Sequence, residues 1–295
     1  MGVNSVECRH TVSRPNRERQ RAVLPSPDVL CGILDVLCRR NCAVRLLHLR
    51  APEAAPDLLA QYKLDGCVWY LPDAALFPRI TKLMRQCAIP VVVPIMSYTP
   101  ADLSGLPPNH FAHDFPAVGR VRTDYLLGRG HRRIAYCAST QAGPYAGFTA
   151  ALAGVGMAQN PDWNLPRVDD IPRRLPCLLD ASAVTAIICD GGRNRIESVL
   201  RVLDGHRWRR QGELLLDFIG GALAEVTAAF PRVKVTAVNF YAHQEIGRGA
   251  AEALVDAVRD GRPIQSVRYA STVRPPTWSS FHKRGEMPLQ DRTVE

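Results

Sequence analysis

The chain has 295 residues, 46% of them hydrophobic, and a formal net charge of +9. This length exceeds one average domain and suits two lobes, each with a sizeable core. No run of about 18 apolar residues occurs, so no membrane span is predicted. The N-terminal segment lacks the apolar stretch of a signal peptide, and a cytoplasmic protein is expected.

Cysteine usage and glycine spacing indicate neither a metal nor a cofactor. The nine cysteines are scattered along the chain, which is typical of free thiols in a reducing compartment. Cys38 and Cys42 are one helical turn apart, but no second pair of ligands lies nearby, as a zinc site would need. Gly191-Gly192 is not followed by the Gly-Lys of a phosphate-binding loop.

Basic residues are concentrated near the start of the chain. The first fifty residues hold nine arginines against four acidic residues. This bias suits contact with nucleic acid, and the arginine-rich usage of a GC-rich gene explains it equally well. Residues 1–21 have no periodic apolar face and are expected to form a basic, flexible arm. Residues 276–295 are expected to form a polar tail.

Between these ends, strand-length apolar runs alternate with helical patterns. Expected strands lie at 21–24, 44–49, 66–71, 89–93, 110–112, 134–137, 184–189, 214–219, 233–238 and 266–271. Expected helices lie at 29–41, 55–62, 76–86, 145–155, 194–203 and 245–260, and another begins near Asp114. Residues 156–180 are rich in proline and in charged residues, and neither a helix nor a strand is predicted there. The alternation predicts an α/β fold with parallel sheets covered on both faces.

Three motifs carry a resemblance to a known family. They are Gly130-His-Arg-Arg-Ile-Ala-Tyr136, Gly147-Phe-Thr-Ala-Ala-Leu152, and Val238-Asn-Phe240 followed by Ile246-Gly-Arg-Gly-Ala-Ala-Glu-Ala-Leu254. Together they resemble the effector-binding domain of LacI/GalR-type transcriptional regulators over roughly residues 22–275.

The resemblance implies two Rossmann-like lobes of the type I periplasmic-binding-protein kind. The implied N-terminal lobe comprises residues 22–138 and 243–263, and the C-terminal lobe comprises residues 139–242 and 264–275. The chain would cross between the lobes three times, near residues 137–140, 238–243 and 262–266.

In such folds, ligands bind at the carboxyl ends of the strands, here in the cleft expected between the lobes. Asp114 stands where the family often has an acid that accepts hydrogen bonds from sugar hydroxyls, although it could instead cap the following helix. Asp190 aligns with an acid of a family turn and could likewise be a cap. Tyr98, Tyr145 and Phe240 could stack on a ligand or pack at the rim of the cleft.

Two positions depart from the family pattern. Pro144 stands where the family usually has an arginine that clamps the effector, and Ile219 stands where it has an acid that contacts the effector. Without the guanidinium, bidentate hydrogen bonding is lost. An ordinary aldose-binding mode is therefore not expected.

The resemblance implies a ligand-sensing domain for a small polar metabolite, a saccharide or a derivative of one. No nucleophile elbow, metalloprotease motif or paired-carboxylate motif occurs, so no enzyme is predicted. The alternatives are a solute-binding protein for transport and a degenerate regulator that dimerises without binding a ligand.

Further partners are a second copy of the chain and, weakly, DNA. The helices at 29–41 and 76–86 carry apolar residues beyond one stripe, including Cys31, Val36, Cys38 and Met84, which predicts a homodimer. No complete helix-turn-helix is found in the sequence. DNA binding is therefore expected only as weak contacts of the basic arm, or through an N-terminal domain absent from this sequence.

Overall fold

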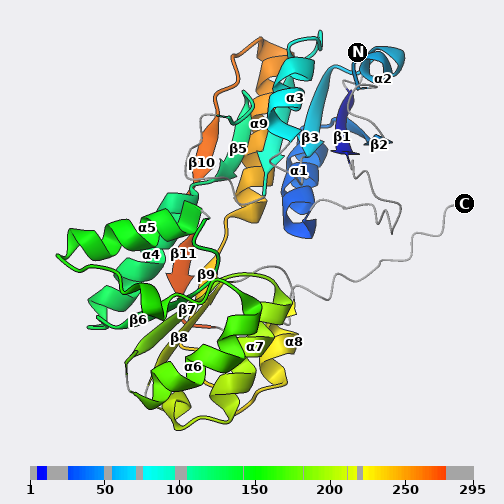
Figure 1. Cartoon of the computed structure of the whole chain (residues 1–295). Coiled ribbons are helices and arrows are strands. Elements are labelled where there is room, and N and C mark those ends of the chain that lie inside the picture. Colours follow the sequence, from blue (N-terminus) through cyan, green and yellow to red (C-terminus); the bar gives the residue numbers. More distant parts are fainter. Residues whose placement is uncertain are drawn as a thin grey trace, which may run out of the picture. The chain divides into compact units, whose positions relative to one another are not determined.

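The chain folds into two units, each built on one β-sheet (Figure 1). The computed structural model describes residues 5–11, 26–49, 55–70, 76–96, 105–141, 143–181, 183–210, 212–217 and 222–276. Unit 1 comprises Met1–Gly119, Gln141–Gly147 and Tyr241–Ser271. Unit 2 comprises Arg120–Thr140, Phe148–Phe240 and Thr272–Glu295.

Unit 1 contains a six-stranded sheet in the order β10-β5-β4-β3-β1-β2. Its strands are β1 (Ser5–Thr11), β2 (Ala43–Leu49), β3 (Gly66–Tyr70), β4 (Val91–Ile95), β5 (His110–His113) and β10 (Val267–Tyr269). All neighbouring strands run parallel. Strands β3, β4 and β5 are buried along their whole length, as expected when helices cover both faces of a parallel sheet.

Side-chain alternation gives this sheet two separate cores. Val68, Val92 and Phe111 pack against α1 (Pro27–Arg39) and α9 (His243–Asp260). The opposite face, which includes Trp69 and Ala112, packs against α2 (Ala55–Gln61) and α3 (Phe77–Met84).

Helices α1 and α9 lie side by side and cross at a pair of glycines (Figure 1). A Cβ atom added at Gly32 of α1 would overlap the carbonyl oxygen of Gln244, and one added at Gly247 of α9 would overlap that of Val29. Glycine therefore permits the backbones to approach this closely. The approach brings the first turn of α9 within electrostatic range of Asp28 at the start of α1.

Unit 2 contains a five-stranded sheet in the order β11-β9-β8-β7-β6. Its strands are β6 (Ile134–Cys137), β7 (Ala186–Cys189), β8 (Glu213–Asp217), β9 (Ala237–Phe240) and β11 (Thr272–Arg274). Strands β6 to β9 are parallel, and β11 pairs antiparallel with β9. The helices that complete the architecture are α4 (Phe115–Gly128), α5 (Gly143–Gly154), α6 (Ile171–Asp180), α7 (Arg193–Asp204) and α8 (Ala222–Ala228).

Alternation along these strands also separates two faces. One face packs against α6, α7 and α8 and contributes Ala135, Cys137, Ile187, Cys189, Leu214, Leu216 and Val238 to a single apolar core. Because successive strand residues point to opposite faces, Tyr136, Ile188, Asp217 and Asn239 lie on the other face. Helices α4 and α5 reach that face, where Arg122 of α4 meets Asp217 and Phe148 of α5 stacks on Tyr136.

The expected α/β class with parallel sheets is confirmed, and most elements lie within a few residues of their expected positions. Helices α6 and α8 are not predicted by the sequence analysis. The expected last strand at 266–271 contains β10 of the first sheet, and it is followed by β11 of the second sheet, which the sequence analysis did not predict. The expected strand at 21–24, the basic side chains Arg14, Arg17, Arg19 and Arg21, and the polar tail after 276 lie outside the described residues.

Residues 5–11, expected to belong to a flexible arm, form β1 and pair with both β2 and β3. The arm assignment is therefore wrong for this segment, because backbone hydrogen bonds to two neighbours can hold a strand that has no alternating apolar face. The implied lobes also differ from the units. Residues 120–138 fall in unit 2 rather than with the N-terminal lobe, and residues 264–271 fall in unit 1.

The apolar residues cited for dimerisation do not form one surface. Val36 and Met84 are buried within unit 1, whereas Cys31 and Cys38 are exposed. Burial of the first two residues removes them from any contact surface. A homodimer stays a prediction.

Candidate functional site

A buried ion triad lies at the carboxyl ends of the unit 2 strands. Arg122 of α4 donates a hydrogen bond from Nη1 to Oδ2 of Asp217, the last residue of β8. The same Nη1 lies 3.1 Å from Oδ2 of Asp190, which follows β7 directly. The three side chains are 0 to 4% exposed. A guanidinium is retained in such a place because carboxylates compensate the cost of its desolvation.

Asn239 lies beside this triad, and its amide has no hydrogen-bond partner in the part of the chain that the structure describes. It is opposite Asp217 in the register between β9 and β8, and its side chain is fully buried. Among the described residues, neither its Nδ2 nor its Oδ1 makes a hydrogen bond. Buried amides are normally hydrogen-bonded. This amide therefore presents one donor group and one acceptor to a molecule that reaches it.

Tyr136 of β6 lies on the same face of the sheet and stacks on Phe148, with ring centroids 4.7 Å apart. Burial raises the pKa of its phenol, while the guanidinium of Arg122 acts in the opposite direction. The phenol thus stays protonated at neutral pH and can serve only as a neutral hydrogen-bonding group.

A hollow of about 320 Å³ opens at the start of α7, directly after Asp190, and is lined by Val168, Gly191, Gly192, Arg193, Asn194 and Arg195. Gly191 has a φ of 140°, and a Cβ there would lie 2.9 Å from Nε of Arg195. Only glycine adopts this backbone readily. Arg195 is held by the carbonyl oxygens of Leu165 and Pro166, at 3.3 and 2.9 Å.

At the carboxyl end of the unit 1 sheet, aromatic rings surround His113, the last residue of β5. Its imidazole makes edge contacts with Phe115 and Tyr241, at centroid distances of 5.6 and 4.8 Å, and a tilted contact with His243 at 5.1 Å. The ring of Tyr241 stacks on that of His243. Burial, followed by the charge of His243, lowers the pKa of His113 to about 3. His113 is therefore neutral at physiological pH.

Asp114 follows His113 and caps helix α4. Its Oδ1 accepts a hydrogen bond of 3.0 Å from the backbone N–H of Ala117. This is the capping geometry that was one of the two alternatives for the residue. Asp190, by contrast, is not the N-cap of the helix that follows it, because Gly192 holds that position in α7.

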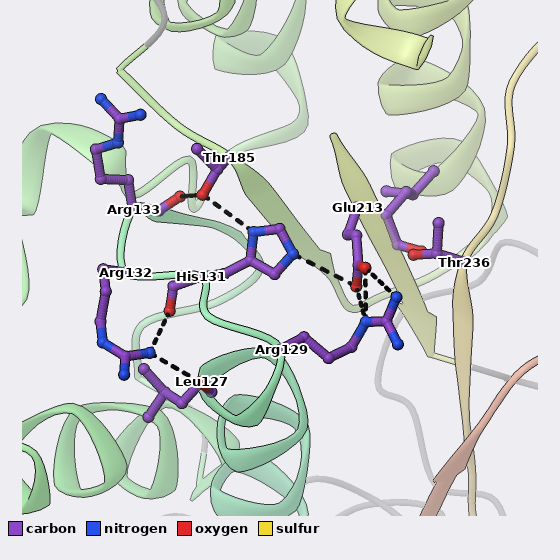
Figure 2. A network of polar contacts seen from close by, with 9 residues as sticks. Leu127, Arg129, His131, Arg132, Arg133, Thr185, Glu213 and Thr236 are labelled. Carbon is purple, nitrogen blue, oxygen red and sulfur yellow. Dashed lines mark hydrogen bonds and ion pairs between the residues drawn. The ribbon is translucent and has the colours of Figure 1, made fainter. Parts of the chain in front are cut away.

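The amino ends of the unit 2 strands hold a different polar network, which involves the Gly130-His131-Arg132-Arg133 motif (Figure 2). Nδ1 of His131 lies 3.1 Å from the hydroxyl of Thr185, and its Nε2 lies 3.6 Å from Glu213. Glu213 also accepts hydrogen bonds of 2.6 and 2.8 Å from Nε of Arg129. The motif thus joins the end of α4 to the amino ends of β7 and β8, and its role there is structural.

The expected aromatic residues are not gathered at one site. Tyr145 lies on α5 in unit 1 and is partly exposed. Phe240 ends β9 in unit 2, where the guanidinium of Arg274 covers its ring at 4.1 Å. Tyr98 lies outside the described residues. The binding roles of Asp114, Asp190 and these aromatics stay predictions.

The sequence analysis missed Arg122, Asp217, Asn239 and His113. A polar residue that ends an otherwise apolar strand is the signal that could have found Asp217, Asn239 and His113. Arg122 gives no such signal, because it lies within a helix that also carries Arg120, and its local pattern does not set it apart.

Within the described ranges, no group of three or more His, Cys, Asp or Glu residues could hold a metal ion. No described helix is both long enough and apolar enough to span a membrane.

No protein-family model and no curated protein sequence matches this chain. Solved structures do resemble it. The regulator in a "transcriptional regulator CelR-cellobiose complex" superposes with a TM-score of 0.63 at 20% identity, covering 92% of this chain and 85% of that one. The Lac repressor bound to ONPG gives 0.64 at 12% identity, with coverages of 93% and 81%.

A LacI-family regulatory protein from Chloroflexus aggregans gives a TM-score of 0.64 at 18% identity, with coverages of 90% and 96%. At these identities the similarity establishes the fold. The chain has the α/β fold of LacI-type regulators, as the sequence motifs imply.

Proposed function

We propose that this chain is the ligand-sensing domain of a LacI-type transcription regulator and binds a small polar metabolite, a saccharide or a sugar derivative. The fold shared with such regulators supports this proposal, and so does the cellobiose in the name of one similar structure. In this proposal the chain acts as a homodimer and catalyses no reaction.

The observation that carries the proposal is the buried amide of Asn239 beside Asp217 and Asp190. An amide offers both a donor and an acceptor, and a carboxylate accepts hydrogen bonds. Sugar hydroxyls both donate and accept, so they complement this set of groups. The position also fits the general rule that ligands of open α/β sheets bind at the carboxyl ends of the strands.

A thermal-shift screen tests the proposal. The full chain would be heated with D-glucose, D-ribose, cellobiose, D-glucosamine and D-glucuronate. A ligand present at 100 times its Kd stabilises the folded state by about 2.7 kcal/mol. At least one sugar should raise Tm, and the absence of any shift across the panel would refute the proposed function.

Two variants locate the effect. Asn239→Leu should keep the fold, because the amide makes no hydrogen bond within the described structure, and it should reduce the ligand-induced shift. Asn164 is the matched control, since it is also buried in unit 2 but its Oδ1 accepts a hydrogen bond of 2.6 Å from Gln159. Asn164→Leu should lower Tm and leave the ligand-induced shift intact.

A further inference from the structure

His113, like Asn239, is a buried polar side chain at the carboxyl end of a strand, and it makes no hydrogen bond within the described part of the chain. Only 2% of it is exposed, and neither Nδ1 nor Nε2 has a partner among the described residues. A buried donor without a partner destabilises the fold. A packing role alone would favour a phenylalanine here, because the ring is already bordered by Phe115, Tyr241 and His243.

His110, a histidine with a structural role on the same strand, has a hydrogen-bond partner for one of its two ring nitrogens. It lies three residues earlier on β5, on the face that packs against α3, and its Nδ1 is 2.9 Å from the carbonyl oxygen of Pro107. Both histidines are buried, and burial lowers the pKa of both. They differ at Nδ1, which has a backbone partner in His110, whereas neither nitrogen of His113 has a partner among the described residues; Nε2 of His110 has none there either.

The surroundings of His113 indicate which kind of ligand group could hydrogen-bond to it. A neutral imidazole carries one N–H donor and one bare nitrogen acceptor. Asp28 and Glu245 act electrostatically on the adjacent His243, and both are acidic. They disfavour an anion at this place. A hydroxyl group can both donate and accept, and the aromatic rings offer apolar faces to sugar C–H groups.

We propose that His113 is a recognition residue of unit 1 for an uncharged, hydroxyl-bearing ligand, with Tyr241 as the adjacent ring wall. This inference rests on the proposed function and adds to it a recognition residue and a charge class for the ligand. Its imidazole is held in position by three ring contacts before any ligand arrives. Such preorganisation lowers the entropic cost of binding.

The test compares His113→Phe with His110→Phe in the full chain, using isothermal titration with whichever neutral sugar of the panel raises Tm. Phenylalanine keeps the ring contacts at position 113 and removes both nitrogens. His113→Phe should leave Tm unchanged or raise it while weakening sugar binding at least tenfold. His110→Phe should lower Tm, because it loses the hydrogen bond to Pro107, and should change affinity less than threefold.

Each other outcome counts against one of the two proposals. If the wild type binds the sugar and His113→Phe binds it equally well, His113 is not a recognition residue although the proposed function stands. Binding of D-glucuronate in preference to the neutral sugars would overturn the charge class. If no sugar binds the wild type, the proposed function and this inference fall together.

Discussion

Nη1 of Arg122 lies 3.1 Å from Oδ2 of Asp190, and the same nitrogen donates to Asp217. One guanidinium thus joins the middle of α4 to the ends of two neighbouring strands, β7 and β8. The arrangement fixes Asp190 at the start of the loop that leads into α7 and forms the hollow there. The position of a proposed ligand residue therefore depends on a positive charge that is wholly buried.

Removal of this charge is expected to destabilise unit 2. Arg122→Leu should cost about 3–5 kcal/mol of unfolding free energy, because it leaves buried carboxylates without their counter-ion. The double variant Arg122→Leu/Asp217→Leu should recover only part of that loss, because Asp190 stays buried without its counter-ion. Urea denaturation measures both. Arg129→Leu is the control, since Arg129 is exposed and its pair with Glu213 (Figure 2) should contribute much less to stability than the buried triad. Equal losses in the two single variants would contradict the prediction.

The crossing of α1 and α9 gives a second prediction. Gly32→Ala and Gly247→Ala should each destabilise the protein by about 1–3 kcal/mol, the usual cost of overpacking, because each new methyl group would overlap a carbonyl oxygen of the other helix. At Gly128, the last residue of α4, an added methyl group would meet open space. Gly128→Ala should be neutral or slightly stabilising, and a loss equal to that of Gly32→Ala would show that helix geometry, rather than contact, sets the cost.

The sequence allows the fold to be predicted because its periodic signals are strong. Helix α9 and the motifs around Gly130 and Gly147 combine apolar spacing with glycine stops, and burial of both sheet faces produces apolar strands that are easily recognised. Helix α6 is missed because Pro176 lies inside it, and proline normally excludes helix. Strand β1 is missed because its support comes from backbone pairing rather than from an apolar pattern.

The site is harder to predict, because its residues come together only through tertiary contacts. Arg122 and Asp217 are 95 positions apart, and nothing in either local pattern names the other. Asp114 shows the converse problem, since a carboxylate at a helix start has the same sequence signature whether it caps the helix or binds a ligand. The register of β8 and β9 decides that Asn239 lies beside Asp217.

The buried thiols of unit 2 should be unreactive in the native state. Cys137 and Cys189 are opposite each other on β6 and β7, and burial raises the pKa of Cys137 to about 12 and that of Cys189 well above its usual value. The thiolate is the nucleophile, so iodoacetamide should modify both residues only after unfolding. Peptide mass spectrometry should find the exposed Cys31, Cys38 and Cys177 modified first. Native modification of Cys137 at a similar rate would contradict its burial.

The stability of the protein should fall as the pH is lowered from about 7 towards 5. In the unfolded chain His113 takes up a proton near pH 6.5, whereas in the folded protein burial and the charge of His243 lower its pKa to about 3. Between these values the unfolded state binds one more proton. The unfolding free energy then decreases by up to about 1.4 kcal/mol per pH unit for this residue. His243 adds to the effect, because burial also lowers its pKa, although Asp28 and Glu245 oppose that shift.

Urea titrations at pH 7.0, 6.0, 5.5 and 5.0 measure this dependence, and His113→Phe provides the comparison. The variant should show a shallower loss of stability than the wild type over this range, since it has no proton to gain at position 113. At pH 5 it should therefore be the more stable of the two. Parallel curves for the two proteins would mean that the imidazole of His113 takes up its proton as readily in the folded protein as in the unfolded chain. That result would also mean that part of the His113 population is charged at neutral pH.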